Sequence, residues 1–258
     1  MGACLLYYTR PKRNYNEIVE NLLADPSNFP AGYGIINFPA LVPDGEREET
    51  LRGKSMKTNE EVWSIVNALK ELYPDGLCSL EYEKDYELLF SVRLAAQCTD
   101  ERVNKVTPAL FARFPTLEAL AGADVAEVEQ YIHSTGFFRA KARDIVRSAQ
   151  MLLSDYGGKV PGTMEELLKL PGVGRKTANL ILGDVYHTPG VVVADTHCIR
   201  ITGLLGLTDG SKDPAKVEQQ LRQVLPPEES NNFCHRMVLH GRAVCVARRP
   251  QCGSCTLR

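Results

Sequence analysis

The chain has 258 residues, of which 44% are hydrophobic and 24% are charged, and its formal net charge at pH 7 is -2. This composition excludes a chain that is disordered throughout, and it predicts one or two globular domains with a hydrophobic core. No stretch is apolar for long enough to cross a bilayer, and the opening residues do not resemble a secretory signal. We therefore expect a soluble intracellular protein without membrane contact, in the cytoplasm or nucleoid if its source is bacterial.

Residues 1–55 are rich in Pro, Gly and Asn, and they form an N-terminal extension to which the sequence assigns no role. Met56 is followed by the pattern Thr58-x-x-Glu61, in which both side chains can cap the start of a helix. An internal translation start at Met56 is therefore one hypothesis. Apolar residues after Thr58 recur at spacings of three and four, which predicts an amphipathic helix.

Helix signals continue along the rest of the chain. Helix starts are predicted at Asp124-x-x-Glu127, at Thr163-x-x-Glu166 and at Asp213-Pro214, the last before a helix to Leu225. Helix ends are predicted at Gly136, Gly157 and Gly241. The single strand-like stretch, residues 191–193, is too short to build a sheet, so the sequence predicts an all-α fold.

A glycine-containing turn at residues 170–178, Leu-Pro-Gly-Val-Gly-Arg-Lys-Thr-Ala, lies between two predicted helical runs. Because Gly172 and Gly174 carry no side chains, the backbone amides there and at the start of the next helix can approach a phosphate. The pattern indicates a helix-hairpin-helix that binds the DNA backbone rather than the bases, and Arg175 adds a positive charge beside it. A simple corner between two helices is the alternative.

The sequence LPGVGRKTANLIL, followed downstream by VVVADTHCIR, resembles the signature of the endonuclease III family of helix-hairpin-helix DNA glycosylases. The resemblance extends from about Met56 to the C-terminus. It implies that Lys176 is the nucleophile and Asp195 the essential carboxylate. Related adenine-DNA glycosylases and thymine-mismatch enzymes lack a lysine at this position, so Lys176 implies a combined glycosylase and AP lyase.

The same resemblance implies two helical domains with a DNA cleft between them. One is a helical barrel at residues 78–189 that contains the hairpin, and the other joins residues 56–77 to residues 190–258. The expected partner is damaged double-stranded DNA, bound by a monomer. The expected reaction removes an oxidised pyrimidine and cleaves the strand 3' of the abasic site by β-elimination.

The proposed chemistry requires Lys176 to be neutral when it attacks C1' of the damaged nucleotide. The dipole of the following helix contributes little to this, so desolvation must supply most of the change, while a nearby Asp195 would favour the charged form. A lysine that only holds a phosphate is the alternative for Lys176. Asp195 is also expected to cap the helical run that it opens, and His197 is expected to be structural.

A base inside the duplex cannot reach Lys176, so its nucleotide must be flipped out and the gap filled. Gln97, in the sequence Leu-Ala-Ala-Gln-Cys-Thr-Asp, resembles the intercalating glutamine of the family. Phe137, in Ser-Thr-Gly-Phe-Phe-Arg-Ala-Lys, lies where the family has an apolar wedge. The alternatives are a helix-end amide for Gln97 and a core phenylalanine for Phe137.

Cysteines near the C-terminus follow the spacing Cys245-x6-Cys252-x2-Cys255, with Arg248 and Arg249 between them. The segment resembles the 4Fe-4S loop of the family, in which a fourth cysteine comes five residues after the third. The sequence ends before that position, so we expect either a truncated chain or a cluster that lacks one ligand. This spacing fits 4Fe-4S better than a structural zinc.

Basic residues gather in two places despite the net charge of -2. In the cysteine loop, the two arginines are expected to contact DNA phosphates, with a solvated basic tail as the alternative. The second group is opposed only by Asp144 and consists of Arg139, Lys141, Arg143 and Arg147.

Two rival functions remain open from the sequence. A non-catalytic helix-hairpin-helix module would bind DNA without chemistry, but Asp195 and the cysteine loop argue against it. A monofunctional glycosylase would use Lys176 to hold a phosphate and Asp195 to activate water.

Overall fold

A computed structural model describes residues 57–257 of the chain. These residues belong to one compact unit. The predictions made for residues 1–55 and for a start at Met56 therefore lie outside the described residues.

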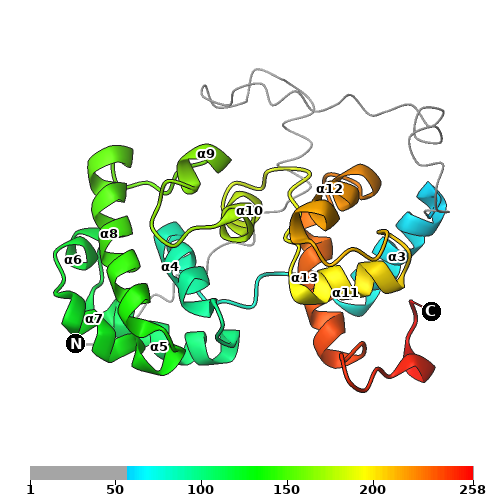
Figure 1. Ribbon diagram of the computed structural model, residues 1–258, viewed down its shortest axis with the longest axis horizontal. Helices are drawn as coiled ribbons and strands as arrows, with labels where there is room; N and C mark the ends of the chain where they lie inside the picture. The colour runs from blue at the N-terminus through cyan, green and yellow to red at the C-terminus, as the bar shows by residue number, and fades with distance from the viewer. Residues whose placement is uncertain (1–56, 258) are drawn as a thin grey trace, which may run out of the picture. The chain divides into compact units, whose positions relative to one another are not determined.

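The described chain is built from helices, and no strand occurs within residues 57–257 (Figure 1). The elements are α3 (Asn59–Leu72), α4 (Asp85–Ala95), α5 (Asp100–Arg113), α6 (Leu117–Ala121), α7 (Val125–Ile132), η2 (His133–Thr135), α8 (Phe138–Tyr156), α9 (Met164–Leu167), α10 (Arg175–Asp184), α11 (Thr196–Leu204), α12 (Pro214–Val224), α13 (Ser230–Ala243) and η3 (Cys252–Ser254). The all-α prediction is confirmed. Residues 191–193 are buried but irregular, because they have no partner strand.

The predicted helix starts are where the capping patterns put them. Thr58 and Glu61 form a reciprocal capping box at α3, and the Thr163 side chain accepts a hydrogen bond from the backbone of Glu166. Asp124 and Asp213 cap α7 and α12 through their side chains. Each of these caps pairs an amide that the first helical turn leaves without a backbone acceptor.

The prediction that a helix ends at Gly241 is wrong. Gly241 lies inside α13, where the ring of His197 from α11 occupies the space that a Cβ atom would need. The glycine therefore serves a close approach of two helices and not a helix end. The other predicted ends are correct, since η2 stops before Gly136 and α8 stops before Gly157.

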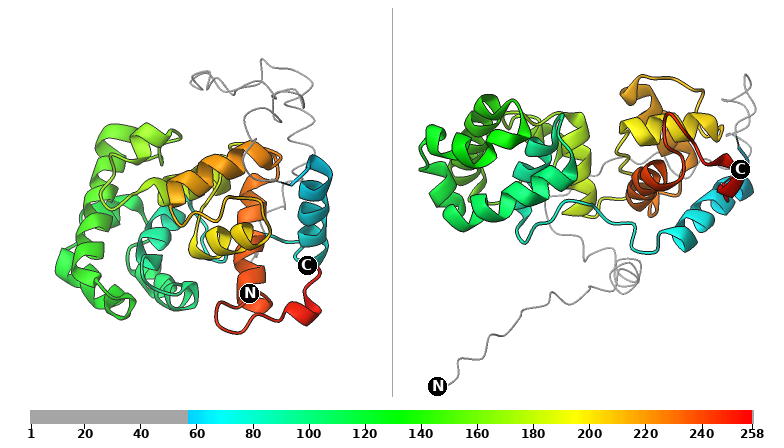
Figure 2. Two further views of the ribbon diagram at one scale, coloured as in Figure 1. Left: turned by 45° about the vertical axis from the view of Figure 1, so that its right-hand side comes forward. Right: turned by 90° about the horizontal axis from the view of Figure 1, so that it is seen from below.

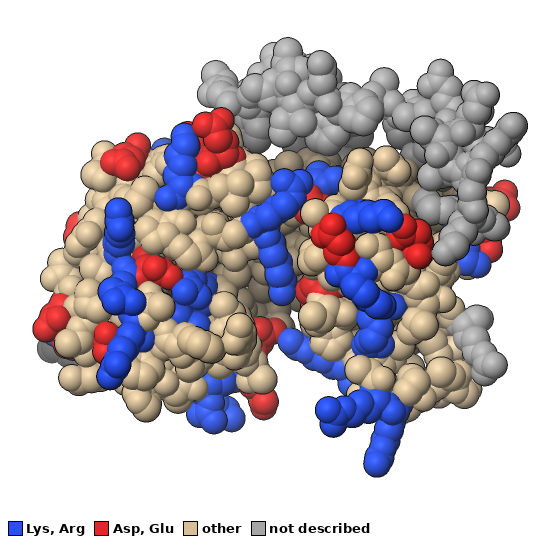
Figure 3. Space-filling model, viewed as in Figure 1, with Lys and Arg blue, Asp and Glu red and all other residues tan. Residues whose placement is uncertain are grey.

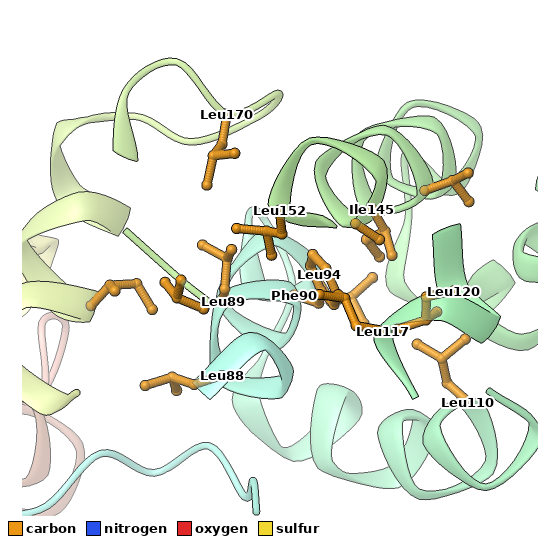
Figure 4. Packing of buried hydrophobic residues seen from close by; sticks show 14 of the residues in the cluster. Leu88, Leu89, Phe90, Leu94, Leu110, Leu117, Leu120, Ile145, Leu152 and Leu170 are labelled. Atoms are coloured by element: carbon orange, nitrogen blue, oxygen red, sulfur yellow. The ribbon is translucent and has the colours of Figure 1, made fainter. Parts of the chain in front are cut away.

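A first hydrophobic core is built from residues between Leu80 and Val191. Figure 4 shows its interior, where Phe90 and Leu94 of α4 lie near Ile145 of α8 and Leu117 of α6. Full burial of such side chains stabilises the fold by about 1.5–3 kcal/mol each. This core holds α4, α8 and α10 together, and these helices carry the hairpin and the turns at Gln97 and Phe137.

A second core joins segments that are far apart in the chain. It combines Val62, Val66 and Leu69 of α3 with residues from Val192 to Leu257. Figure 2 shows α3 beside α13, and the Tyr73 carbonyl accepts a hydrogen bond from Nε of Arg236 at 3.1 Å. The assignment of residues 78–189, and of 56–77 with 190–258, to separate domains stays a prediction.

None of the helices within residues 57–257 combines the length and the apolar character needed to cross a membrane.

Candidate active site

The predicted hairpin is a tight turn between α9 and α10. The Val173 amide donates to the Leu170 carbonyl at 3.1 Å, and Gly172 has a φ of +73°. A Cβ at Gly172 would collide with the side chains of Arg93 and Asp144, which form an ion pair below the turn. Glycine is therefore required at position 172 both by its φ and by the close packing.

Gly174 is the N-cap of α10 and has ordinary φ and open space where a Cβ would be. Gly172 and Gly174 are both exposed, so the backbone of the hairpin is accessible from solvent. This arrangement suits an anion bound at the N-terminus of α10.

Lys176 and Asp195 line one cavity of about 320 Å³, although they come from different helices. Lys176 is the second residue of α10 and is exposed, while Asp195 precedes α11 and is partly buried. The other polar residues of the cavity include Asp100, His197 and Arg242. A cavity of this size fits a ligand such as an extrahelical nucleoside.

Asp195 is the N-cap of α11, as the sequence predicts. Its Oδ1 accepts a hydrogen bond from the backbone amide of Cys198 at 2.7 Å. The cap fixes the carboxylate at the end of a helix whose Cys198, Ile199 and Ile201 are packed in the second core. Its capping role is thus compatible with a chemical role in the cavity.

Asp100 and Arg242 form an ion pair on the cavity wall, which the sequence analysis did not single out. Nη2 of Arg242 lies 2.8 Å from Oδ2 of Asp100, and Ser79 donates to the same oxygen. Burial raises the pKa of Asp100, but these hydrogen bonds and the charges of Arg242 and Lys176 lower it by more. In the sequence, Asp100 could be recognised only as an acidic residue in the first turn of the helix that follows Gln97. That position indicates a favourable contact with the helix dipole and does not predict a pair with Arg242.

His197 lines the cavity and also packs against Gly241, so the expectation that it is structural stays a prediction. Its Nδ1 is buried and has no hydrogen-bond partner within the described part of the chain. Desolvation lowers the pKa of His197 below its usual value, although the charge of Asp195 opposes this shift. A neutral ring packed against Gly241 follows from these contacts.

Cys78 is one of the cysteines on the cavity wall. Burial and the charge of Asp184 raise the pKa of this thiol to about 12. It therefore stays protonated at neutral pH and is a poor competitor for the nucleophilic role of Lys176.

The two predicted wedge residues both occupy exposed turns. Gln97 follows the end of α4 with a φ of +55°, and Phe137 precedes α8 with a φ of +48°. Phe137 is 68% exposed, so it is not a core phenylalanine. A large apolar side chain held outside the core is typical of a binding surface.

Arg175 has a carboxylate partner in the free protein. Its Nε and Nη2 each lie 2.8 Å from an oxygen of Glu218 in α12. Arg248 and Arg249 are exposed in the C-terminal loop. Figure 3 shows Lys and Arg side chains on both sides of the hollow in the face it draws.

The three predicted ligands, Cys245, Cys252 and Cys255, do not form a metal-binding cluster in the structure. No group of three or more His, Cys, Asp or Glu residues suited to a metal occurs among residues 57–257. The Cys245 sulfur accepts a hydrogen bond from Arg200 at 3.2 Å, and the Cys255 sulfur lies 3.6 Å from Nε2 of His240. The residues described therefore do not fit a 4Fe-4S cluster in this arrangement.

Residues 90–227 match the model of the HhH-GPD superfamily base excision DNA repair proteins. Endonuclease III of Synechocystis sp. is 47% identical over 208 residues, which cover 81% of this chain and 94% of that protein. The chain belongs to the endonuclease III family. Endonuclease III of Escherichia coli (strain K12) is 38% identical over 193 residues, covering 75% of this chain and 90% of that protein.

Solved structures give the same assignment. A trapped covalent intermediate of endonuclease III with DNA has 40% sequence identity and a TM-score of 0.73, covering 78% of this chain and 94% of that chain. A thermostable thymine-DNA glycosylase, at 19% identity and a TM-score of 0.67, shares the fold. The protein is thus a base-excision-repair DNA glycosylase, and AP lyase activity is typical of its family.

Proposed function

We propose that this endonuclease III family member removes oxidised pyrimidines from double-stranded DNA and cleaves the strand through a Schiff base on Lys176. The observation that carries the proposal is that Lys176, in the first turn of α10, lines the same cavity as Asp195. The amine and the carboxylate come from two helices that converge on a space large enough for a flipped nucleotide.

In the first step, the neutral Lys176 Nζ attacks C1' of the damaged nucleotide while the bond from C1' to the base breaks. The base leaves with the bonding electrons and takes up a proton. The first amine proton is lost, and the nitrogen lone pair then forms the C1'=N bond as the C1'–O4' bond breaks. O4' takes up a proton, which opens the sugar ring and leaves a protonated imine. Removal of a C2' proton then expels the 3' phosphate by β-elimination.

Asp195 has two possible actions in this sequence. Its carboxylate either accepts the proton that Lys176 loses or stabilises the positive charge that develops on the sugar. Because Lys176 is exposed in the free protein, water exclusion by the bound DNA would supply the desolvation that favours its neutral form.

DNA binding is proposed to use the backbone amides at Gly172 and Gly174 for one phosphate, with Arg248 and Arg249 as further phosphate contacts. Gln97 and Phe137 would enter the base stack from their exposed turns. Arg175 would contribute to DNA binding only if its pair with Glu218 opened.

The endonuclease III family is generally associated with a 4Fe-4S cluster. In this chain the resemblance assigns its ligands to Cys245, Cys252 and Cys255. Their present contacts do not assemble such a site, so no step of the reaction is attributed to a cluster.

Borohydride trapping tests the proposal. The protein is incubated with a duplex that carries thymine glycol or an abasic site, and the imine is reduced to a stable amine. We expect a covalent protein–DNA adduct for the wild type and none for Lys176→Ala. Lys159→Ala removes an exposed lysine outside the cavity, and it should form the adduct as the wild type does.

Each other outcome identifies a different function. Base release without an adduct would indicate a monofunctional glycosylase in which Lys176 holds a phosphate. An adduct that survives in Lys176→Ala would show that another amine is the nucleophile. Specific DNA binding with neither base release nor an adduct would indicate a binding module and would contradict the proposal.

A further inference from the structure

Lys141 is a buried cation that the proposed reaction does not use. Its side chain is 0% exposed, and its Nζ lies 2.8 Å from the carbonyl oxygens of both Leu94 and Thr135. Removing an ammonium from water is unfavourable unless hydrogen bonds compensate for it. Burial lowers the pKa of Lys141, while Cys98 and Arg93, which lie nearby, act in opposite directions.

The two carbonyls that Lys141 binds lie just before the two turns that carry the proposed wedge residues. Leu94 is near the C-terminal end of α4, three residues before Gln97, and Thr135 ends η2, two residues before Phe137. Gln97 and Phe137 both adopt left-handed backbone conformations, which non-glycine residues rarely occupy. Such conformations persist only where surrounding contacts hold them.

The same face of α8 also contacts the hairpin. Asp144, three residues after Lys141, pairs with Arg93 directly below Gly172, and the hydroxyl of Ser148 lies 3.3 Å from the Pro171 carbonyl. One polar face of α8 thus links both wedge turns and the phosphate-binding turn. The spacing of 141, 144 and 148 places these three side chains on one side of the helix.

We propose that Lys141 is a positioning residue for opening the duplex. It holds the turns of Gln97 and Phe137 at a fixed separation, so that both side chains enter the base stack together when the damaged nucleotide leaves it. This inference rests on the proposed function. Its physical basis is that a misplacement of about 1 Å can greatly reduce the effect of a positioned group.

The test compares excision from paired and unpaired DNA. Lys141→Met retains a long side chain but leaves both carbonyls without their donor. Flipping costs least when the base is already single-stranded, so a defect in opening the duplex should disappear there. We expect the single-turnover rate on a thymine glycol duplex to fall about tenfold or more, and the rate on the same single strand to change less than about twofold.

Lys84→Met is the matched control. It removes another lysine-to-carbonyl hydrogen bond, from Lys84 to Pro115 at 2.7 Å, which is exposed and lies at the start of α4, away from both turns. The ratio of paired to unpaired rates should match the wild type. Equal losses of Lys141→Met on both substrates, or no loss on the duplex, would overturn the inference.

Hydrogen–deuterium exchange separates this inference from the proposed function, because it requires no activity. Amides at 95–98 and 135–138 should exchange faster in Lys141→Met, while those of α11 and α13 should not change. Unchanged exchange in both turns would overturn the inference even if the wild type proved inactive. If Lys141→Met does not fold, Lys141→Arg, which keeps the charge with a different donor geometry, is measured for the same rate ratio. Equal losses in that variant on paired and unpaired DNA would also overturn it.

Discussion

Asp195 combines a structural and a chemical role in one side chain. Its Oδ1 caps α11 at 2.7 Å from the Cys198 amide, and the residue also lines the cavity that contains Lys176. Asparagine is as good an N-cap as aspartate but has no negative charge. The two roles can therefore be separated by substitution.

We predict that Asp195→Asn changes the free energy of unfolding by less than about 0.5 kcal/mol, since the cap is retained. Its single-turnover excision rate should nevertheless fall by about tenfold or more, because the charge is lost. Asp195→Ala should lose the same activity and about 1 kcal/mol of stability as well. Denaturant unfolding and excision rates measure the two effects, and full activity in Asp195→Asn would exclude a chemical role for the carboxylate.

Sequence reasoning at the scale of residues succeeds where a motif is local and fails where the partner is distant. Lys141 belongs by sequence to a basic group opposed by Asp144, yet it is buried and Asp144 pairs with Arg93. The sequence of α8 does indicate that Lys141 is buried, because Lys141 falls on the same helix face as Ile145 and Leu152. A lysine on an apolar face predicts burial, but nothing local predicts which carbonyls it binds.

At the scale of elements, the helix-hairpin-helix was predictable because its requirements are local. Gly172 and Gly174 stand in one short turn, and α10 follows at once. Gly241 shows the limit of the same reasoning, since its reason for being glycine is the ring of His197, which lies on another helix. A glycine in a sequence indicates a turn or a close contact, and only the fold decides between them.

The two hairpin glycines should respond differently to alanine. Gly172→Ala should lose about 1–3 kcal/mol of stability, because φ is +73° and the new Cβ would meet Arg93 and Asp144. The new Cβ of Gly174→Ala meets no atom within 4 Å, so the free energy of unfolding should stay within about 1 kcal/mol of the wild type. The variant should nevertheless bind duplex DNA more weakly. Denaturant unfolding and fluorescence anisotropy measure the two properties. Wild-type affinity in Gly174→Ala would argue against close approach of a phosphate there.

At the scale of the whole described chain, the link between the two cores depends on residues that no motif connects. Arg175 begins α10, and Glu218 lies 43 residues later in α12. The Glu218 side chain is only 5% exposed and also accepts a hydrogen bond from Arg222 at 3.0 Å. The 3.6-residue periodicity predicted helices with apolar faces, but it could not predict this contact between them.

The charge of Glu218 should therefore stabilise the protein in a pH-dependent way. Burial raises the pKa of Glu218, but its hydrogen bond with Arg175 and the charge of Arg222 lower it by more, so the net shift is downward. A lowered carboxylate pKa contributes stability that is present above the unfolded value near pH 4.5 and is lost as pH falls through the folded value. Glu218→Gln should thus be less stable than the wild type at pH 7, by about 1–2 kcal/mol, and the difference should shrink below pH 4.5. Glu165→Gln, which breaks an exposed pair with Lys169, should match the wild type throughout. Denaturant unfolding from pH 7 downward measures the difference, and a gap that stays constant with pH would show that the charge of Glu218 does not cause it.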